Sequence, residues 1–472
     1  MSNPACLRNT ERNFGAGLRA ITGARTSAAT HDSDSRCERQ RVQYSDATIT
    51  TTLMSRRIAK VVLAGTASLA SLHAQTLTIA PNRVLTDQVA IIQATGLQAG
   101  EHVTLKADLV DGGGQHWEST AEFAADTQGA INLSKQTPLA GSYHEISAMG
   151  PIWSMKPAEK RADAYRAPPD LGSQTIRFQL LRGDAVIAAA QLQQDAIADD
   201  IGQIKVKGVL HGVLFIPAGS GHHPGVLVLG GSEGGLPLRR AAWLASRGYA
   251  AFALAYFRYE NLPAQLEAIP LEYFGQALSW MKSRQEVLQD QIAVMGVSRG
   301  AELALQLGSM YPLIKAVVAF APANVRHRAC CGGNSAPYAW TWKGLPLAFI
   351  GRNEGGAAAL LAAIDVENTN GPIFLVAGEA DRVWDSASMA RTMVSRLKHK
   401  HFAYPVESLI YPHAGHTAGR PQITPEWHGS TRHPVSGRPV DLGGTPEGNA
   451  DSSIDAIPKV LEFLQKNLRD HS

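Results

Sequence analysis

The sequence has 472 residues, of which 44% are hydrophobic and 18% are charged. At roughly 150 residues per domain this length allows two or three domains, and the composition excludes a wholly disordered, collagen-like or coiled-coil chain. The formal net charge is +3, but residues 1–60 hold ten basic and five acidic residues, which leaves 34 basic and 36 acidic residues in the rest. This near-neutral balance argues against nucleic acid or an anionic membrane surface as a partner.

Residues 54–74 have the three-part layout of a secretory signal peptide. A short basic head is followed by the apolar and small-residue run Val61–Leu72, which is too short to span a bilayer, and cleavage is expected after Ala74. Because a signal peptide begins a chain, we expect Met54 to be the true start and residues 1–53 to be a disordered extension. The alternative is a disordered extension that precedes an ordinary apolar segment. A functional leader places the protein in the periplasm or outside the cell; otherwise it is cytoplasmic.

Residues 75–200 show the alternation of polar and apolar side chains that is typical of β-strands, for example in 103–107 and 176–180. Turn clusters such as Asp111–Gly114 separate these runs. The pattern predicts an antiparallel β-sandwich domain, and residues 195–204 are expected to link it to the second half of the chain.

Residues 205–472 change to buried apolar runs alternating with amphipathic stretches, which is typical of a parallel sheet flanked by helices. The predicted strands are 225–229, 249–255, 292–295, 316–321, 373–377 and 407–411. The predicted helices are 238–246, 271–284, 299–310 and 457–468. No phosphate-binding glycine motif is present, so the order of elements favours an α/β-hydrolase-like domain over a nucleotide-binding fold, with no cofactor expected.

Gly296–Gly300 reads G-V-S-R-G and fits the G-x-S-x-G pattern of a nucleophile elbow. A match to this five-residue pattern occurs easily by chance, so the neighbouring sequence decides whether it marks a nucleophile elbow. The pattern follows the predicted strand 292–295 and opens the predicted helix 299–310, as an elbow requires. We therefore predict that Ser298 is a nucleophile.

A nucleophilic serine needs a histidine base and a carboxylate that orients it, and in this fold both come later in the chain. Asp381 follows the predicted strand 373–377 and is the expected acid, with Glu379 and Asp385 as alternatives. His416 lies in the loop after the next predicted strand and is the expected base, with His413 as the alternative.

Acyl transfer also needs N–H donors for the oxyanion that forms at the reacting carbonyl. One is expected from the backbone amide of Arg299, directly after the nucleophile. The other is expected from the loop Gly230–Gly235, where glycines permit unusual backbone angles, and Ser232 is our choice within it. The alternative is a flexible glycine turn without a catalytic part.

Two irregular segments of this half allow more than one interpretation. Residues 324–371, with Trp340 and Trp342, form either a lid over an acyl pocket or a surface excursion that packs its own aromatic residues. Residues 417–453 are rich in Gly, Pro, His and Arg and either line the mouth of the site or form a solvated loop, which we favour.

The four cysteines are too few for a disulfide scaffold, and no Cys/His spacing indicates a metal site. Cys6 and Cys37 lie in the amino-terminal extension, whereas Cys330 and Cys331 are adjacent. The adjacent pair is either two loop thiols or a strained vicinal disulfide. We favour thiols because ordinary disulfide geometry does not suit neighbouring residues.

From about residue 80 to 468 the sequence resembles the acyl-CoA thioesterase and bile acid-CoA:amino acid N-acyltransferase family. The resemblance implies an immunoglobulin-like β-domain before an α/β-hydrolase domain, with a catalytic triad at Ser298, Asp381 and His416. The segments that carry it are GPIWSMKP (150–157), LGGSEGGL (229–236), ALAYF with the following YENLP (253–263), LEYF (271–274), GVSRGAELAL (296–305), GEADR (378–382) and YPHAGH (411–416).

In this family a cysteine nucleophile goes with conjugation to an amino acid and a serine with hydrolysis. Ser298 therefore implies a hydrolase of acyl thioesters, with fatty acyl-CoA as the small-molecule substrate. If the leader is used, the protein leaves the CoA pool, and hydrolysis of another acyl ester outside the cytosol is then expected. Transfer of the acyl group to an amino acid is a further alternative. A third hypothesis, from another class, is a secreted binding protein with an inert hydrolase half.

Overall fold

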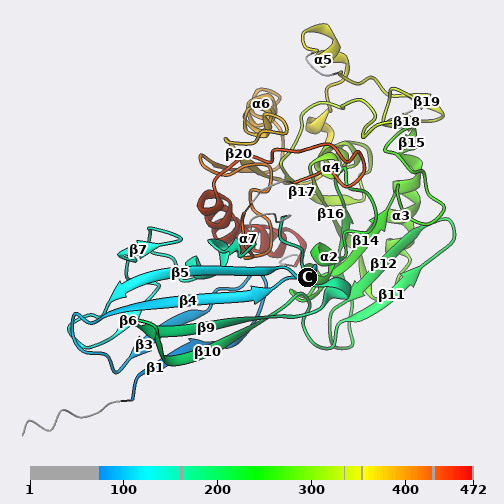
Figure 1. Cartoon of the computed structure of the whole chain (residues 1–472). Coiled ribbons are helices and arrows are strands. Elements are labelled where there is room, and N and C mark those ends of the chain that lie inside the picture. Colours follow the sequence, from blue (N-terminus) through cyan, green and yellow to red (C-terminus); the bar gives the residue numbers. More distant parts are fainter. Residues whose placement is uncertain (1–73, 160–163, 334, 352–353, 428–430, 470–472) are drawn as a thin grey trace, which may run out of the picture. The chain divides into compact units, whose positions relative to one another are not determined.

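A computed structural model describes residues 74–159, 164–333, 335–351, 354–427 and 431–469 (Figure 1). The predicted leader, except for Ala74, and the sequence before it lie outside the described residues. Among the helices that the structure describes, none is both long and apolar enough for a bilayer crossing.

Two β-sheets form the first part of the described chain. The smaller sheet has the order β1 (Thr76–Ala80), β3 (Ile91–Thr95) and β6 (Ile131–Asn132). The larger sheet has the order β2 (Arg83–Leu85), β10 (Ala185–Asp195), β9 (Gln174–Arg182), β4 (His102–Val110), β5 (His116–Ala124) and β7 (Ala140–Gly141), and β8 (Lys156–Pro157) pairs with β5. The short helices α1 (Gly150–Trp153) and η1 (Pro169–Leu171) interrupt this part.

Side chains of β4, β5 and β9 alternate between buried and exposed positions, as the sequence predicts. The buried set contributes Trp117, Phe123 and Phe178 to one core that the two sheets share. Most strand pairs are antiparallel, although β2 and β10 run parallel. The immunoglobulin-like topology implied by the family resemblance stays a prediction.

An eight-stranded sheet organises the second part of the described chain (Figure 1). Its first two strands pair antiparallel, and from β14 onward neighbouring strands are parallel. The order is β11 (Gly202–Val206), β12 (His211–Ile216), β14 (Ala250–Ala255), β13 (His223–Leu229), β16 (Val287–Val297), β17 (Ile314–Phe320), β20 (Ile373–Gly378) and β21 (Val406–Tyr411).

Helices cover both faces of this sheet and bury its apolar side chains in two separate cores. One core contains residues of α3 (Glu272–Lys282), α4 (Arg299–Met310) and α6 (Ser386–His399). The other contains residues of α2 (Leu238–Ala245) and α7 (Pro446–Leu468). Burial on both faces explains the continuous apolar runs of the sequence, and the predicted α/β-hydrolase class is confirmed.

The insertion 324–371 contributes to a small separate sheet. Its strands β18 (Trp340–Trp342) and β19 (Leu345–Pro346) make a three-stranded sheet with β15 (Ile269–Pro270). The short helices α5 (Ala357–Leu361) and η2 (Val366–Asn368) come after these strands.

Buried polar contacts join the first sheets to the α/β part. The Nε2 atom of Gln194, on β10, donates to the carbonyl oxygen of Ile423 at 3.2 Å. The carboxylate of Asp87 accepts a hydrogen bond from Trp243 Nε1 at 2.9 Å and pairs with Arg247, both on or next to α2. Because the Asp87 side chain is only 2% exposed, its charge depends on these partners.

We predict that Asp87→Ala lowers the free energy of unfolding by about 3 kcal/mol, because it leaves the partly buried Arg247 without its counter-ion. Denaturant titration followed by circular dichroism measures this loss. Asp199→Ala is the matched control, since Asp199 is exposed and pairs with Arg83 at the surface; it should shift the unfolding midpoint little. Equal effects of the two substitutions would contradict the assignment of Asp87 as a structural link.

Candidate active site

Ser298 occupies a sharp turn between the end of β16 and the start of α4. Its backbone angles are φ 55° and ψ −121°, a region that costs a non-glycine residue about 1–3 kcal/mol. The surrounding backbone holds it there: its N–H donates to the carbonyl of Phe320 at 2.9 Å, and its own carbonyl accepts from the amide of Ala301 at 2.8 Å. The turn therefore exposes the hydroxyl at the carboxyl edge of the sheet.

The two glycines of G-x-S-x-G are required by close backbone contacts. A Cβ atom on Gly296 would lie 1.9 Å from the carbonyl oxygen of Gly300. A Cβ atom on Gly300 would lie 2.2 Å from the carbonyl oxygen of Gly230, in the loop after β13. Any side chain at either position would push β16, α4 and this loop apart.

The predicted base and acid lie beside Ser298 in a continuous row of hydrogen bonds. The Oγ atom of Ser298 is 2.8 Å from Nε2 of His416, and Nδ1 of His416 is 2.8 Å from Oδ2 of Asp381. Because an ionised carboxylate only accepts hydrogen bonds, Nδ1 carries the ring proton and Nε2 is free to accept from the serine hydroxyl. Ser298 and His416 are only 8% and 9% exposed.

Asp381 is held by the turn that leads into α6. Its Oδ1 atom accepts from the amides of Val383 and Trp384 at 2.9 and 3.3 Å, and the hydroxyl of Ser386 donates to Oδ2 at 2.7 Å. These donors fix the carboxylate toward the imidazole of His416. Sequence reasoning could not identify them, since they share no motif with the aspartate.

The alternative acids and base have other partners or positions. Glu379 pairs with Arg391, and the side chain of Asp385 caps α6 by accepting from the amide of Ser388 at 3.0 Å. His413 is exposed. The structure therefore brings Ser298 together with Asp381 and His416, which are the acid and the base that the sequence favours over the alternatives.

The segment 417–453 contributes to the site, so the expectation of a solvated loop is wrong. The amide of His416 donates to the carbonyl of Leu442 at 2.7 Å, which anchors the base to this segment. The same segment supplies several walls of a cavity of about 320 Å³ that opens onto Ser298 and His416. The lining residues are Ser232, Glu233, Arg240, Val297, Ser298, Phe320, Val383, His416, Thr417, Ala418, Arg420, Thr431, Arg432, His433, Pro434, Val440 and Leu442.

Ser232 lines this cavity, and its hydroxyl is tied to His433. The Nδ1 atom of His433 accepts from the amides of Val435 and Ser436, both at 3.2 Å, so Nε2 carries the proton. That proton points to Oγ of Ser232, 2.9 Å away. Burial lowers the pKa of His433, which favours this neutral form. The Ser232 hydroxyl proton is therefore left for another acceptor.

The side chain of Arg299 belongs to a buried network centred on Glu302, whose own side chain is 0% exposed. Glu302 accepts from Arg299 Nη2 at 3.2 Å, from Trp340 Nε1 at 2.7 Å and from His327 Nδ1 at 2.9 Å. Burial opposes ionisation, but Arg299 and the hydrogen bonds hold the pKa of Glu302 below its ordinary value. The backbone amide of Arg299 is the first of α4 and has no acceptor within that helix.

The insertion 324–371 packs Trp340 on α4 through this network and supplies none of the described cavity-lining residues. The surface-excursion interpretation therefore fits better than a lid. Within the insertion, Cys330 and Cys331 are joined by a disulfide bond, so the expectation of free thiols is wrong. The Sγ atom of Cys331 lies 3.6 Å from Nε2 of His433.

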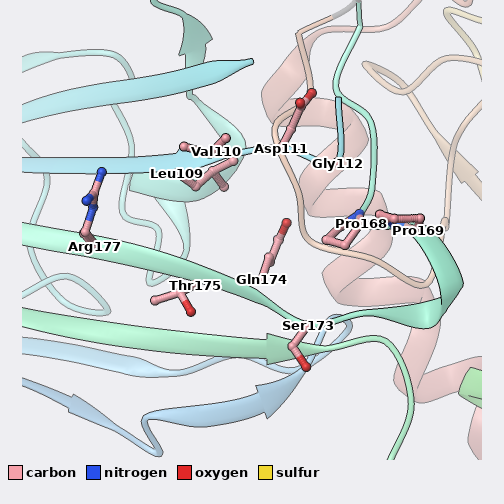
Figure 2. A pocket seen from close by; sticks show the side chains of 10 residues that line it. All are labelled: Leu109, Val110, Asp111, Gly112, Pro168, Pro169, Ser173, Gln174, Thr175 and Arg177. Carbon is pink, nitrogen blue, oxygen red and sulfur yellow. The ribbon is translucent and has the colours of Figure 1, made fainter. Parts of the chain in front are cut away.

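A second, more open cavity of about 620 Å³ lies at the ends of β4 and β9 (Figure 2). Asp111 is its acidic side chain, but both oxygens are already used by the surrounding turn: Oδ1 accepts from two amides, and Oδ2 accepts from Trp117 Nε1 and the amide of Arg166. This cavity contains no nucleophile and base in contact. Within the described ranges, no group of acidic, His and Cys side chains could hold a metal ion.

The sheet order and the elbow at Ser298 define an α/β hydrolase. Residues 87–208 match the family model described as "Acyl-CoA thioester hydrolase/BAAT N-terminal region". Residues 269–331 and 353–470 match the model described as "BAAT / Acyl-CoA thioester hydrolase C terminal".

Curated relatives match over most of both sequences. Acyl-coenzyme A thioesterase 6 of Mus musculus is 30% identical, covering 84% of this chain and 97% of its own length. Acyl-coenzyme A amino acid N-acyltransferase 1 of Mus musculus is 30% identical, with 82% and 96% covered. Bile acid-CoA:amino acid N-acyltransferase of Homo sapiens is 29% identical, with 83% and 97% covered. The chain belongs to the acyl-CoA thioester hydrolase/BAAT family, which confirms the resemblance.

We predict that Glu302→Ala lowers the free energy of unfolding by about 3–5 kcal/mol, because it leaves the guanidinium of Arg299 buried without a counter-ion. Glu302→Gln should cost less, since an amide oxygen still accepts from Trp340. Chemical denaturation measures both losses, with the exposed Glu462→Ala as the control. Equal stability of the wild type and Glu302→Ala would contradict a supporting role for this carboxylate.

Proposed function

We propose that this protein is a serine hydrolase that cleaves acyl thioesters, with fatty acyl-CoA as the leading substrate, through an acyl-serine intermediate. The observation that carries the proposal is the hydrogen-bonded row of Ser298, His416 and Asp381 at a cavity. Membership of a family whose matched relatives include a named acyl-CoA thioesterase supports the thioester as substrate.

In the first half of the reaction, Ser298 Oγ attacks the carbonyl carbon of the thioester while Nε2 of His416 takes the hydroxyl proton. The carbonyl becomes a tetrahedral oxyanion. The C–S bond then breaks, the leaving sulfur receives the proton from His416, and the acyl group stays on Ser298 as an oxygen ester. Asp381 stabilises the imidazolium that exists between these steps and keeps its proton on Nδ1.

In the second half, a water molecule attacks the acyl-serine carbonyl and gives one proton to Nε2 of His416. Collapse of the second oxyanion breaks the bond to Ser298 Oγ, which recovers the proton from His416. The products of the whole cycle are a carboxylic acid and a thiol. An amino acid amine in place of water would give the N-acyl transfer for which the other matched relatives are named.

The oxyanion lies, in this proposal, between the amide of Arg299 and the donors of the Gly230–Gly235 loop. The Arg299 amide directly follows the nucleophile and has no acceptor in its helix. Ser232 lines the same cavity as Ser298, and its hydroxyl proton is available because His433 donates to its oxygen. The leader 54–74 supports a further proposal, export from the cytosol; an exported enzyme would meet acyl esters other than CoA thioesters.

We predict that Ser298→Ala and His416→Ala each reduce kcat for acyl-CoA hydrolysis by at least about 10³-fold, because each removes a member of the proton-transfer row. Release of free CoA detected with a thiol reagent measures the rate. His413→Ala is the control: it removes an exposed histidine three residues from the base and should retain wild-type rates. A His416→Ala enzyme with near-native turnover would remove His416 from the mechanism.

A fluorophosphonate probe tests the nucleophile without any choice of substrate. The wild type should be labelled and Ser298→Ala should not. Absence of labelling in both would favour the inert binding protein instead. Parallel assays with acyl-CoA, simple oxygen esters, and acyl-CoA plus glycine or taurine then separate thioester hydrolysis from ester hydrolysis and from transfer.

We predict that Ser232→Ala lowers kcat by about 10²–10³-fold with a smaller change in KM, because a lost oxyanion donor affects the transition state most. His433→Ala should have a smaller effect, since it only orients the Ser232 hydroxyl. Steady-state kinetics on one acyl-CoA measures both. Native kcat in Ser232→Ala would leave the backbone amides alone as oxyanion donors.

A further inference from the structure

One residue of the turn between β20 and α6, Trp384, contacts both the acid and the base of the site. Its backbone amide donates to Oδ1 of Asp381 at 3.3 Å. Its indole ring meets the imidazole of His416 nearly at a right angle, with the ring centres 5.5 Å apart and the planes inclined by 74°. Aromatic rings attract each other in this arrangement. Trp384 therefore touches both partners of the hydrogen bond that sets the tautomer and direction of the base.

The indole ring is in turn supported by a second histidine. The ring of His327, in the insertion 324–371, stacks on Trp384 with the ring centres 4.8 Å apart and the planes inclined by only 20°. The Nε1 atom of Trp384 is buried and has no hydrogen-bond partner among the residues that the structure describes. Packing between rings, rather than a hydrogen bond, therefore fixes the orientation of the indole.

The contacts of His327 connect this support to the helix that follows the nucleophile. Its Nδ1 atom and its backbone amide both donate to Oε2 of Glu302, at 2.9 and 3.2 Å. The guanidinium of Arg299 donates to the backbone carbonyls of His327 and Arg328, at 3.1 and 2.8 Å. Arg299 and Glu302 belong to the first turn of α4, which begins directly after Ser298. The ring of His327 is therefore held from the same turn that carries the nucleophile.

Together these contacts form a closed series around the site. The first part runs from Ser298 through α4 and Glu302 to His327. The second part runs from His327 through Trp384 to His416. The separation of 2.8 Å between His416 Nε2 and Ser298 Oγ closes the series. Because a misplacement of about 1 Å between reacting groups can cost about 10²-fold in rate, a support that prevents rotation of the imidazole matters for turnover.

We propose that Trp384 is a positioning residue: supported by the ring of His327, it holds the imidazole of His416 in the orientation that joins Asp381 to the nucleophile. This inference rests on the proposed function, in which His416 transfers the protons. Trp384 is not among the described residues that line the cavity at Ser298. It acts through His416, so its loss should lower the rate of the chemical steps and leave substrate binding nearly unchanged.

The kinetic test removes the indole ring and then restores an aromatic ring. Trp384→Leu should lower kcat for acyl-CoA hydrolysis about 10- to 100-fold and change KM by less than about twofold. Trp384→Phe keeps a ring beside His416 and should recover most of the loss. His327→Ala should lower kcat when Trp384 is present and change it little in Trp384→Leu, because its stacking partner is already absent.

Trp342→Leu is the matched control. Trp342 is a half-buried tryptophan of the same insertion that packs edge-on against Tyr311, with the ring centres 6.2 Å apart; this variant should retain the wild-type kcat. If Trp384→Leu fails to fold, His327→Ala and Trp384→Phe still carry the comparison. Native kcat in Trp384→Leu, no recovery in Trp384→Phe, or a loss expressed mainly in KM would each overturn the proposal.

A spectroscopic measurement separates this inference from the proposed function. The Nδ1 proton of His416, in its hydrogen bond to Asp381, should give a strongly deshielded proton resonance in NMR spectra that is absent from His416→Ala. In Trp384→Leu this resonance should broaden or vanish, because a mobile imidazole exposes the proton to water, whereas Trp342→Leu should retain it. If the wild type hydrolyses no thioester, the function fails and the resonance still tests Trp384. An unchanged resonance in Trp384→Leu would overturn the positioning role.

Discussion

Close backbone packing at the carboxyl edge of the parallel sheet is the constraint on which the site depends. The turn at Ser298 exists only because Gly296 and Gly300 let β16, α4 and the loop after β13 approach within contact distance. The same principle holds at the base, where a Cβ atom on Gly415 would lie 2.3 Å from the backbone of Gly443. Rigid backbone contacts of this kind hold the imidazole and the hydroxyl 2.8 Å apart although they are far apart in sequence.

The sequence predicts the parallel sheet well because its strands are buried on both faces and read as continuous apolar runs. Each of the six predicted strands and four predicted helices corresponds to an observed element. The antiparallel strands β11 and β12, at one edge of the sheet, and helix α6 are missed. β11 has no continuous apolar run, and α6 is rich in polar residues, so neither has a strongly apolar sequence.

The row of Ser298, His416 and Asp381 could be selected because an elbow motif and strand order identify its members. The sequence alone could not identify the side chains that support these three residues. Glu302, Ser386 and His433 act through side-chain contacts that no local sequence pattern predicts, and the vicinal disulfide contradicts the general preference for separated cysteines. The segment 417–453 looked solvated because of its Gly, Pro and charged residues, yet it forms part of the cavity wall.

A covalent acyl-enzyme is the central claim, and rapid quenching followed by peptide mass spectrometry tests it most directly. The enzyme is mixed with an acyl-CoA, denatured in acid within one turnover, digested and analysed for peptides that have gained the acyl mass. The account predicts that the acyl group lies on the peptide containing Ser298 and is attached to that residue. Acylation of a different residue during productive hydrolysis would contradict it.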